Sequence, residues 1–298
     1  MQYQVTHTTT YQYSEPVSLC QNVAHLTPRD APGQRCLHTS LSVAPEPAVL
    51  ADRADYFGNP STFFAVQEPH HELVVTASHL IDLAPGPAAD PSHSPPWEEV
   101  RDLLTADRSP ATLGAYQFVF GSRYTQPGPD LATYAIPSFV RGRPLLEAVL
   151  ELTARIHRDF VYDPRATTVA TPLPEVFARR RGVCQDFAHL EIACLRSLGL
   201  AARYVSGYLC TSARQGQPRL VGADATHAWL SVWCPRAGWV DVDPTNDVVP
   251  SDKHLLLAWG RDYDDVSPIK GVILGGGQHA VQVSVDVTRV EPDEAATR

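Results

Sequence analysis

The stretch RRGVCQDFAHLEIACLRSLGLAARYVSGYL, residues 180–209, predicts a helix followed by a strand. Gly199 is expected to end the helix, as a glycine just past the last turn often does. The part after it, ARYVSGYLC (202–210), is rich in β-branched and aromatic residues and is typical of a strand. The helix is expected to be mostly buried, because apolar residues recur in it at roughly helical spacing. These residues are Phe187, Leu190, Ile192, Cys194, Leu195, Leu198 and Leu200.

Cys184 lies in the first turn of this helix, after Gly182 and the basic run at 179–181. The first backbone N–H groups of a helix have no intrahelical partners, and the helix dipole is positive there. Such a place favours a thiolate over a thiol, and the same N–H groups can bind an oxyanion. Cys184 is therefore a candidate nucleophile. The alternative is a small apolar core residue, which is the usual role of a lone cysteine.

Two further strands offer a base and an acid for that nucleophile. A thiol needs a base, and the base needs a third group that fixes its tautomer. His227 opens the first strand, and Asp241 and Asp243 share one face of the second. Either aspartate could reach a histidine on the partner strand, and periodicity does not choose between them. The predicted hairpin consists of HAWLSVWC (227–234), the turn PRAG (235–238) and GWVDVDP (238–244).

His227 and Asp243 each also have an ordinary structural interpretation. A single histidine at a strand start is most often a surface or hydrogen-bonded histidine. Asp243, directly before Pro244, is also typical of a turn aspartate. The combination of Cys184, His227 and Asp243 therefore carries more weight than any one of them.

In order and local form, CQDFAHL, RYVSGYL, THAW and GWVDVDPTN resemble the core of the bacterial and archaeal transglutaminase-like cysteine peptidases. The resemblance covers nearly the whole chain. It includes the opening MQYQVTHTTTYQYSEPVSLCQNVAHLTPR, DYFGNP at 55–60, and GRDYDDVSPIKGVILGGGQHAVQVSVDV at 260–287. One departure is visible, because the residue after the nucleophile is often arginine in this family and is Gln185 here.

The resemblance implies an α+β fold. Its papain-like or transglutaminase-like core has the cysteine-bearing helix packed on an antiparallel sheet, preceded by an N-terminal β-sandwich-like domain. The resemblance also selects Asp243 as the acid, because the family's acid stands in the DPT motif. We expect an N-terminal β-rich domain at 1–84, a connecting segment with short helices at 85–143, and the catalytic core with C-terminal strands at 144–298.

The implied chemistry is acyl transfer through a thioester on Cys184, most simply hydrolysis of a peptide or other amide, with no metal or cofactor. A cross-linking transglutaminase is the closest alternative. A non-catalytic binding protein that keeps the fold and an arylamine N-acetyltransferase are the others. Relatives of the family are often associated with ATP-grasp-type peptide-forming enzymes, so a small or modified peptide is an expected substrate.

Three neighbouring residues have competing interpretations. We expect Asp186 to stabilise the helix start by charge–dipole attraction. His189 lies well round the helix from Cys184 and is expected to pack rather than act as a base. Trp229 either lines the site beside His227 or packs in the core, and the sequence favours neither.

Composition narrows the class of partner and compartment. The net charge of −9 and the isoelectric point near 5.7 argue against nucleic acid as a partner. The N-terminus has no signal-peptide pattern and no apolar run approaches a membrane span, so no membrane partner is expected. The six cysteines are scattered without a C-x-x-C pair, which fits a reducing cytoplasm.

Overall fold

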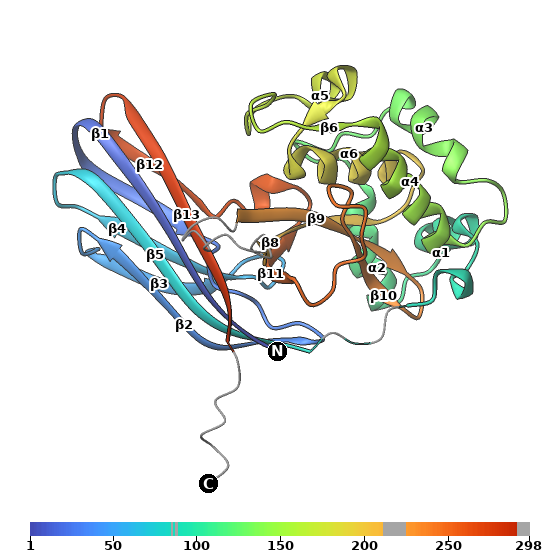
Figure 1. Ribbon diagram of the computed structural model, residues 1–298, viewed down its shortest axis with the longest axis horizontal. Coiled ribbons are helices and arrows are strands. Elements are labelled where there is room, and N and C mark those ends of the chain that lie inside the picture. The colour runs from blue at the N-terminus through green and yellow to red at the C-terminus, as the bar shows by residue number, and fades with distance from the viewer. Residues whose placement is uncertain (85, 87–88, 211–224, 291–298) are drawn as a thin grey trace, which may run out of the picture.

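The computed structural model describes residues 1–84, 86, 89–210 and 225–290 of the chain. Figure 1 shows a sheet of long strands lying beside a second body, in which helices cover a smaller sheet. The α+β fold class and the strand-rich N-terminal region expected from the sequence are both confirmed.

The large sheet is built around β1, which is long enough to pair with different neighbours along its two halves. Its first half pairs with β5 on one side and β13 on the other, and its second half pairs with β4 and β12. All of these pairings are antiparallel. The seven strands are β1 (Gln2–Ala24), β2 (Gln34–Ala44), β3 (Val49–Ala54), β4 (Pro60–Val66), β5 (His70–Leu83), β12 (Ile269–Gly275) and β13 (His279–Val290).

Strands β12 and β13 come from the C-terminal end of the described chain, yet they lie in the N-terminal sheet. The sequence-based division grouped them with the catalytic core, at 144–298. In space they belong with residues 1–84, because both pair with β1.

The smaller sheet has the antiparallel order β10-β9-β8-β11. The expected hairpin is present, and its turn places Arg236 and Gly238 at positive φ. The strands are β8 (Ala202–Leu209), β9 (Ala225–Cys234), β10 (Gly238–Val242) and β11 (His254–Gly260), and a separate two-stranded parallel pair is formed by β6 (Val161–Tyr162) and β7 (Arg181–Gly182).

The described residues include six α-helices, which lie in the same body as this sheet. Helix α6 is buried on nearly all sides, because it packs both on the sheet and against other helices in one hydrophobic core. It ends before Gly199, whose φ of 78° suits a glycine. The helices are α1 (Trp97–Ala106), α2 (Pro110–Tyr116), α3 (Pro129–Ala135), α4 (Leu145–Asp159), α5 (Leu173–Arg179) and α6 (Cys184–Ser197).

The two sheets are joined by a hydrophobic cluster of their own. Tyr3 and Val5 of β1 and Val285 of β13 pack there against Tyr208 of β8 and Leu255 of β11. This contact fixes the position of the N-terminal sheet against the sheet that carries His227.

Candidate active site

The α6 N-terminus is locked by a carboxylate. Asp186 Oδ2 accepts hydrogen bonds from the Val183 backbone N–H at 2.8 Å and from Thr167 Oγ1 at 2.6 Å. A side chain at Gly182 would bring a Cβ to 2.6 Å from the same oxygen, so only glycine fits there. Asp186 thus has the structural role expected from the sequence. It holds Cys184, the first residue of α6, in a half-buried position.

His227 lies on β9 between the other two members of the candidate triad. Its Nε2 donates to Asp243 Oδ2 at 2.7 Å, since a carboxylate can only accept. Cys184 is the other group that acts on the ring, and both residues line the same cavity. Burial lowers the pKa of His227, but the interactions with Asp243 and Cys184 outweigh it and raise the pKa to about 9. The imidazole is therefore held as an imidazolium at neutral pH.

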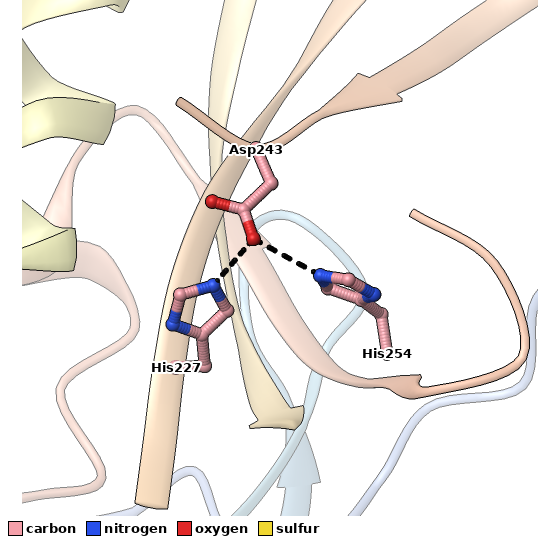
Figure 2. A group of neighbouring side chains, drawn as sticks. All are labelled: His227, Asp243 and His254. Atoms are coloured by element: carbon pink, nitrogen blue, oxygen red, sulfur yellow. Dashed lines mark hydrogen bonds and ion pairs between the residues drawn. The ribbon is translucent and has the colours of Figure 1, made fainter. Parts of the chain in front are cut away.

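Asp243 is fully buried just past the end of β10 and is saturated with donors. Its Oδ2 accepts from His227, from Asn246 Nδ2 at 2.6 Å and from His254 Nε2 at 3.1 Å, while Oδ1 accepts from the Thr245 backbone N–H at 2.9 Å. Burial alone raises the pKa of Asp243, but these donors hold it well below its usual range. Figure 2 shows the carboxylate between the two histidine rings.

Asp241 is directed to different partners. It accepts hydrogen bonds from Trp229 Nε1 at 3.0 Å and from Ser231 Oγ. No contact between Asp241 and His227 is found, so Asp243 is the aspartate that the structure brings to the imidazole. Strand periodicity did not choose between Asp241 and Asp243. The two side chains reach different partners because β10 ends at Val242, so Asp243 no longer follows the alternation of the strand.

The sequence reasoning missed His254 and Asn246. His254 opens β11, which pairs with β8 on the side away from β9, so no local pattern links it to the triad. Asn246 stands in the DPTN motif, and its position three residues after Asp243 was the signal that could have revealed it. Together the two side chains hold the carboxylate in one orientation.

Of the two roles that the sequence left open for Trp229, the structure supports packing, because Trp229 lies beside His227 but does not line the cavity. It is fully buried, and its ring stacks on His227 with centroids 6.1 Å apart and meets His254 edge-on at 5.3 Å. It lies across Gly207, where an added Cβ would come within 2.4 Å of the indole. Gly207 pairs with His227 in the β8–β9 register. The missing side chain therefore leaves room for the ring that supports the imidazole.

Two buried ionisable residues of α6 do not face the thiol. His189 accepts a hydrogen bond from the Tyr263 backbone N–H at 3.1 Å and stacks on Tyr124, and burial lowers its pKa to about 3. It is a neutral packing residue, as expected. Glu191 accepts from Thr153 Oγ1 at 2.8 Å, and burial raises its pKa to about 8.

A cavity of about 400 Å³ opens over Cys184 and His227. The core contributes further residues such as Gln185 and Ser206, and the opposite wall belongs to β1 and β13 of the N-terminal sheet. A larger cavity of about 650 Å³ lies between α3 and α5, and none of the triad residues lines it.

A metal could in principle be held by His227, Asp243 and His254, whose ligand atoms lie within 4.8 Å of one another. The same nitrogen and oxygen atoms are joined here by hydrogen bonds (Figure 2). A cation at this place would have to break the contact between His227 and Asp243.

Among the described residues, no helix combines the length and the apolar character needed to cross a membrane.

Family models and a solved structure both match this chain. Residues 3–82 match the model of the bacterial transglutaminase-like N-terminal region, and residues 137–244 match that of the transglutaminase-like superfamily. A crystal structure described as a candidate cysteine protease from Cytophaga hutchinsonii has a TM-score of 0.76. It is 22% identical, and the match covers 98% of this chain and 92% of that chain.

Relatives are found in mycobacteria and beyond. An uncharacterized protein of Mycobacterium tuberculosis is 42% identical over 299 residues, which is 98% of this chain and 94% of the relative. One from Mycobacterium leprae is 33% identical, over 96% of this chain and 98% of the relative. A protein-glutamine gamma-glutamyltransferase of Pseudomonas aeruginosa is 34% identical over 107 residues, covering 33% of this chain and 16% of that protein.

The two family models match most of the chain, and the structural match has the same fold. The chain therefore belongs to the transglutaminase-like superfamily, and a bacterial transglutaminase-like N-terminal region precedes its core.

Proposed function

We propose that the protein is a cysteine-dependent amidase or peptidase that hydrolyses its substrate through a thioester on Cys184. The observation that carries the proposal is the position of His227, which bonds to Asp243 through Nε2 and has the Cys184 thiol as its other partner. Nδ1, on the far side of the ring from Asp243, is the nitrogen available to the thiol. This is the order of nucleophile, base and orienting acid that acyl transfer requires.

In the first half of the reaction, the Cys184 sulfur attacks the amide carbonyl and the C–N bond breaks. Cys184 is the first residue of α6, so its backbone N–H has no intrahelical acceptor and can donate to the oxyanion. The His227 imidazolium gives its proton to the leaving amine. Asp243 keeps the ring oriented and stabilises its charged form, because its own carboxylate is held ionised by five hydrogen bonds.

In the second half, water attacks the thioester. His227 takes a proton from the water, the C–S bond breaks, and Cys184 and His227 return to their starting state as the acid leaves. No atom is left over, and no metal or cofactor is needed. The six cysteines form no disulfides, which supports work in a reducing compartment such as the cytoplasm.

Transamidation is the second candidate, favoured by the partial similarity to a protein-glutamine gamma-glutamyltransferase. An acceptor amine that arrives as an ammonium would be helped by a carboxylate near the thioester. The described residues that line the cavity include no Asp or Glu. Hydrolysis is therefore the better-supported outcome.

Burst kinetics would test the proposal, with Cys184→Ala as the matched control. Peptide amides, including glutamine-containing ones, should release amine in a burst equal to the enzyme present, and the control should release none. Adding a primary amine should leave the product a free acid. A product that carries the added amine would favour transamidation, and wild-type protein without any turnover would favour a non-catalytic binding protein. Co-purification with an ATP-grasp enzyme, the partner suggested by resemblance, would be a separate measurement.

A further inference from the structure

The wall opposite Cys184 is a small patch on one face of the N-terminal sheet. Thr9 and Tyr11 of β1 lie two residues apart, and so do Val281 and Val283 of β13, so each pair shares a face. In the β1–β13 register Thr9 is opposite Val283 and Tyr11 is opposite Val281. All four line the cavity that contains Cys184 and His227. We call these four residues the acyl wall.

The acyl wall is fixed in position relative to the triad. His7, the next residue on the same face of β1, is buried between the sheets. Its Nδ1 lies 3.1 Å from the hydroxyl of Tyr208 on β8, and its Nε2 lies 3.2 Å from Thr9 Oγ1. Tyr208 directly follows Gly207, the residue opposite His227. The hydrogen bonds thus connect the wall to the strand beside the catalytic histidine.

Among the described residues that line the cavity, His227 is the one that carries a formal charge. The described lining contains no Asp, Glu, Lys or Arg, and burial lowers the pKa of His7 to about 4, which leaves that ring neutral. An ionised substrate group placed here would lose its water without gaining a counter-ion, which is costly.

Part of the acyl wall is apolar surface without a cover. Val281 is 51% exposed and Val283 is 52% exposed, and both look onto the cavity. A bound apolar side chain would remove this surface from water, which is the main source of affinity in concave sites. The described lining thus combines an apolar wall, uncharged hydroxyl and amide groups, and a nucleophile.

We propose that the site takes an internal, uncharged stretch of peptide, with an apolar side chain next to the scissile amide packed on the acyl wall. Chain ends and charged neighbours are disfavoured. This inference rests on the proposed amide hydrolysis and names its substrate class. The N-terminal sheet is therefore part of the specificity site.

The test uses internally quenched peptides of equal length, with Leu, Lys or Glu flanking the cleaved bond. Wild-type protein should prefer Leu over Lys and Glu in kcat/KM by at least about tenfold, the usual scale of hydrophobic-pocket discrimination. Val283→Asp should lower kcat/KM for the Leu peptide and raise it for the Lys peptide. Val281→Lys should raise it for the Glu peptide. Each variant should gain activity on the peptide of opposite charge. A variant that had merely lost its fold would lose activity on every peptide.

Val272→Asp is the matched control. Val272 is an exposed β12 valine, 68% accessible, that does not line the cavity. The control should keep the wild-type order of peptides. Iodoacetamide should alkylate Cys184 at the wild-type rate in Val272→Asp, and it should still alkylate Cys184 in the two acyl-wall variants if their fold is intact.

A second readout does not depend on turnover. Leu peptides should protect Cys184 from iodoacetamide better than Lys or Glu peptides do. Equal protection, or a wild-type preference for a charged neighbour, overturns the inference even where peptides are cleaved. If the Leu peptide protects Cys184 and no peptide is cleaved, the hydrolase proposal fails and the acyl wall stands.

Discussion

His254 Nε2 donates a hydrogen bond to Asp243 Oδ2 at 3.1 Å. The same oxygen accepts the hydrogen bond from His227, the candidate catalytic histidine. His254 touches neither the thiol nor the cavity, so its role would be to position the carboxylate and keep it charged.

Removing that donor should weaken catalysis without abolishing it. His254→Ala should reduce kcat by roughly tenfold, on the scale of one hydrogen bond to a charged group. With fewer donors, the pKa of Asp243 should rise toward its ordinary value, and the acid limb of the kcat–pH profile should move to higher pH. His254→Gln, which can still donate, should restore part of both. An unshifted acid limb in His254→Ala would show that His254 only fills space.

Cys184 should be the thiol that limiting iodoacetamide modifies first. Cys20, Cys194 and Cys234 are buried, and burial raises the pKa of the half-buried Cys36, with Asp30 adding to the effect. Peptide mapping by mass spectrometry should locate the adduct, and activity should fall in proportion to Cys184 labelling. Cys36→Ser is the control and should label at the wild-type rate. Preferential labelling of any other cysteine would defeat the nucleophile assignment.

Asp243 and Leu195 should separate catalysis from stability. Asp243→Asn keeps the volume and removes the charge that stabilises the imidazolium, and in serine-protease triads the corresponding change costs about 10⁴ in rate. Leu195 is fully buried in the core around α6, so Leu195→Ala should cost roughly 2–5 kcal/mol of stability. An activity assay and a thermal melt on both variants make the comparison. Asp243→Asn with normal activity per folded molecule would remove Asp243 from the mechanism.

The raised pKa of His227 should appear in the pH dependence of stability. Between the unfolded value of 6.5 and the folded value of about 9, the native state binds a proton that the unfolded state does not. The stabilisation is therefore complete below pH 6.5 and is lost as pH rises through about 9. Urea unfolding from pH 6 to pH 10 should show this decline in the wild type. His227→Gln should flatten it, and an equally steep decline in that variant would contradict the pKa assignment.

Replacing Glu191 with an uncharged residue should stabilise the protein at alkaline pH. Its pKa of about 8 means that the native state holds a proton which the unfolded state releases above its ordinary value of 4.5. The native state therefore loses stability, relative to the unfolded state, as pH rises from 4.5 to 8. Glu191→Gln keeps an acceptor for Thr153 and cannot ionise, so it should raise the melting temperature at pH 8 and change it little at pH 4.5. A uniform shift at both pH values would point to packing instead.

The sequence predicted the local parts of the site because they follow simple periodicities. The apolar spacing around Leu190 and Leu195 indicated α6, and Gly199 marked its end. The two-residue alternation of 227–234 and 238–244 indicated the β9–β10 hairpin. The choice of Asp243 over Asp241 required the family resemblance, because the alternation stops where β10 ends and the chain turns.

The remaining parts depend on contacts between distant residues, which no local pattern reveals. His254 reaches Asp243 through the pairing of β11 with β8. The acyl wall exists because β13 pairs with β1 across the full length of the chain. In the sequence, Val281 and Val283 look like ordinary strand residues, and nothing local indicates that they face Cys184.

The order of the elements along the chain has a consequence for biosynthesis. Cys184, His227 and Asp243 all precede β13, which supplies two of the four residues of the acyl wall. A ribosome makes the chain from its N-terminus, so the nascent protein contains its reactive groups before it contains Val281 and Val283. A chain stalled between Asp243 and β13 holds the candidate nucleophile but only the β1 half of the acyl wall. Recognition of a substrate on the complete acyl wall, as proposed above, therefore has to wait until the C-terminal strand has paired with the first.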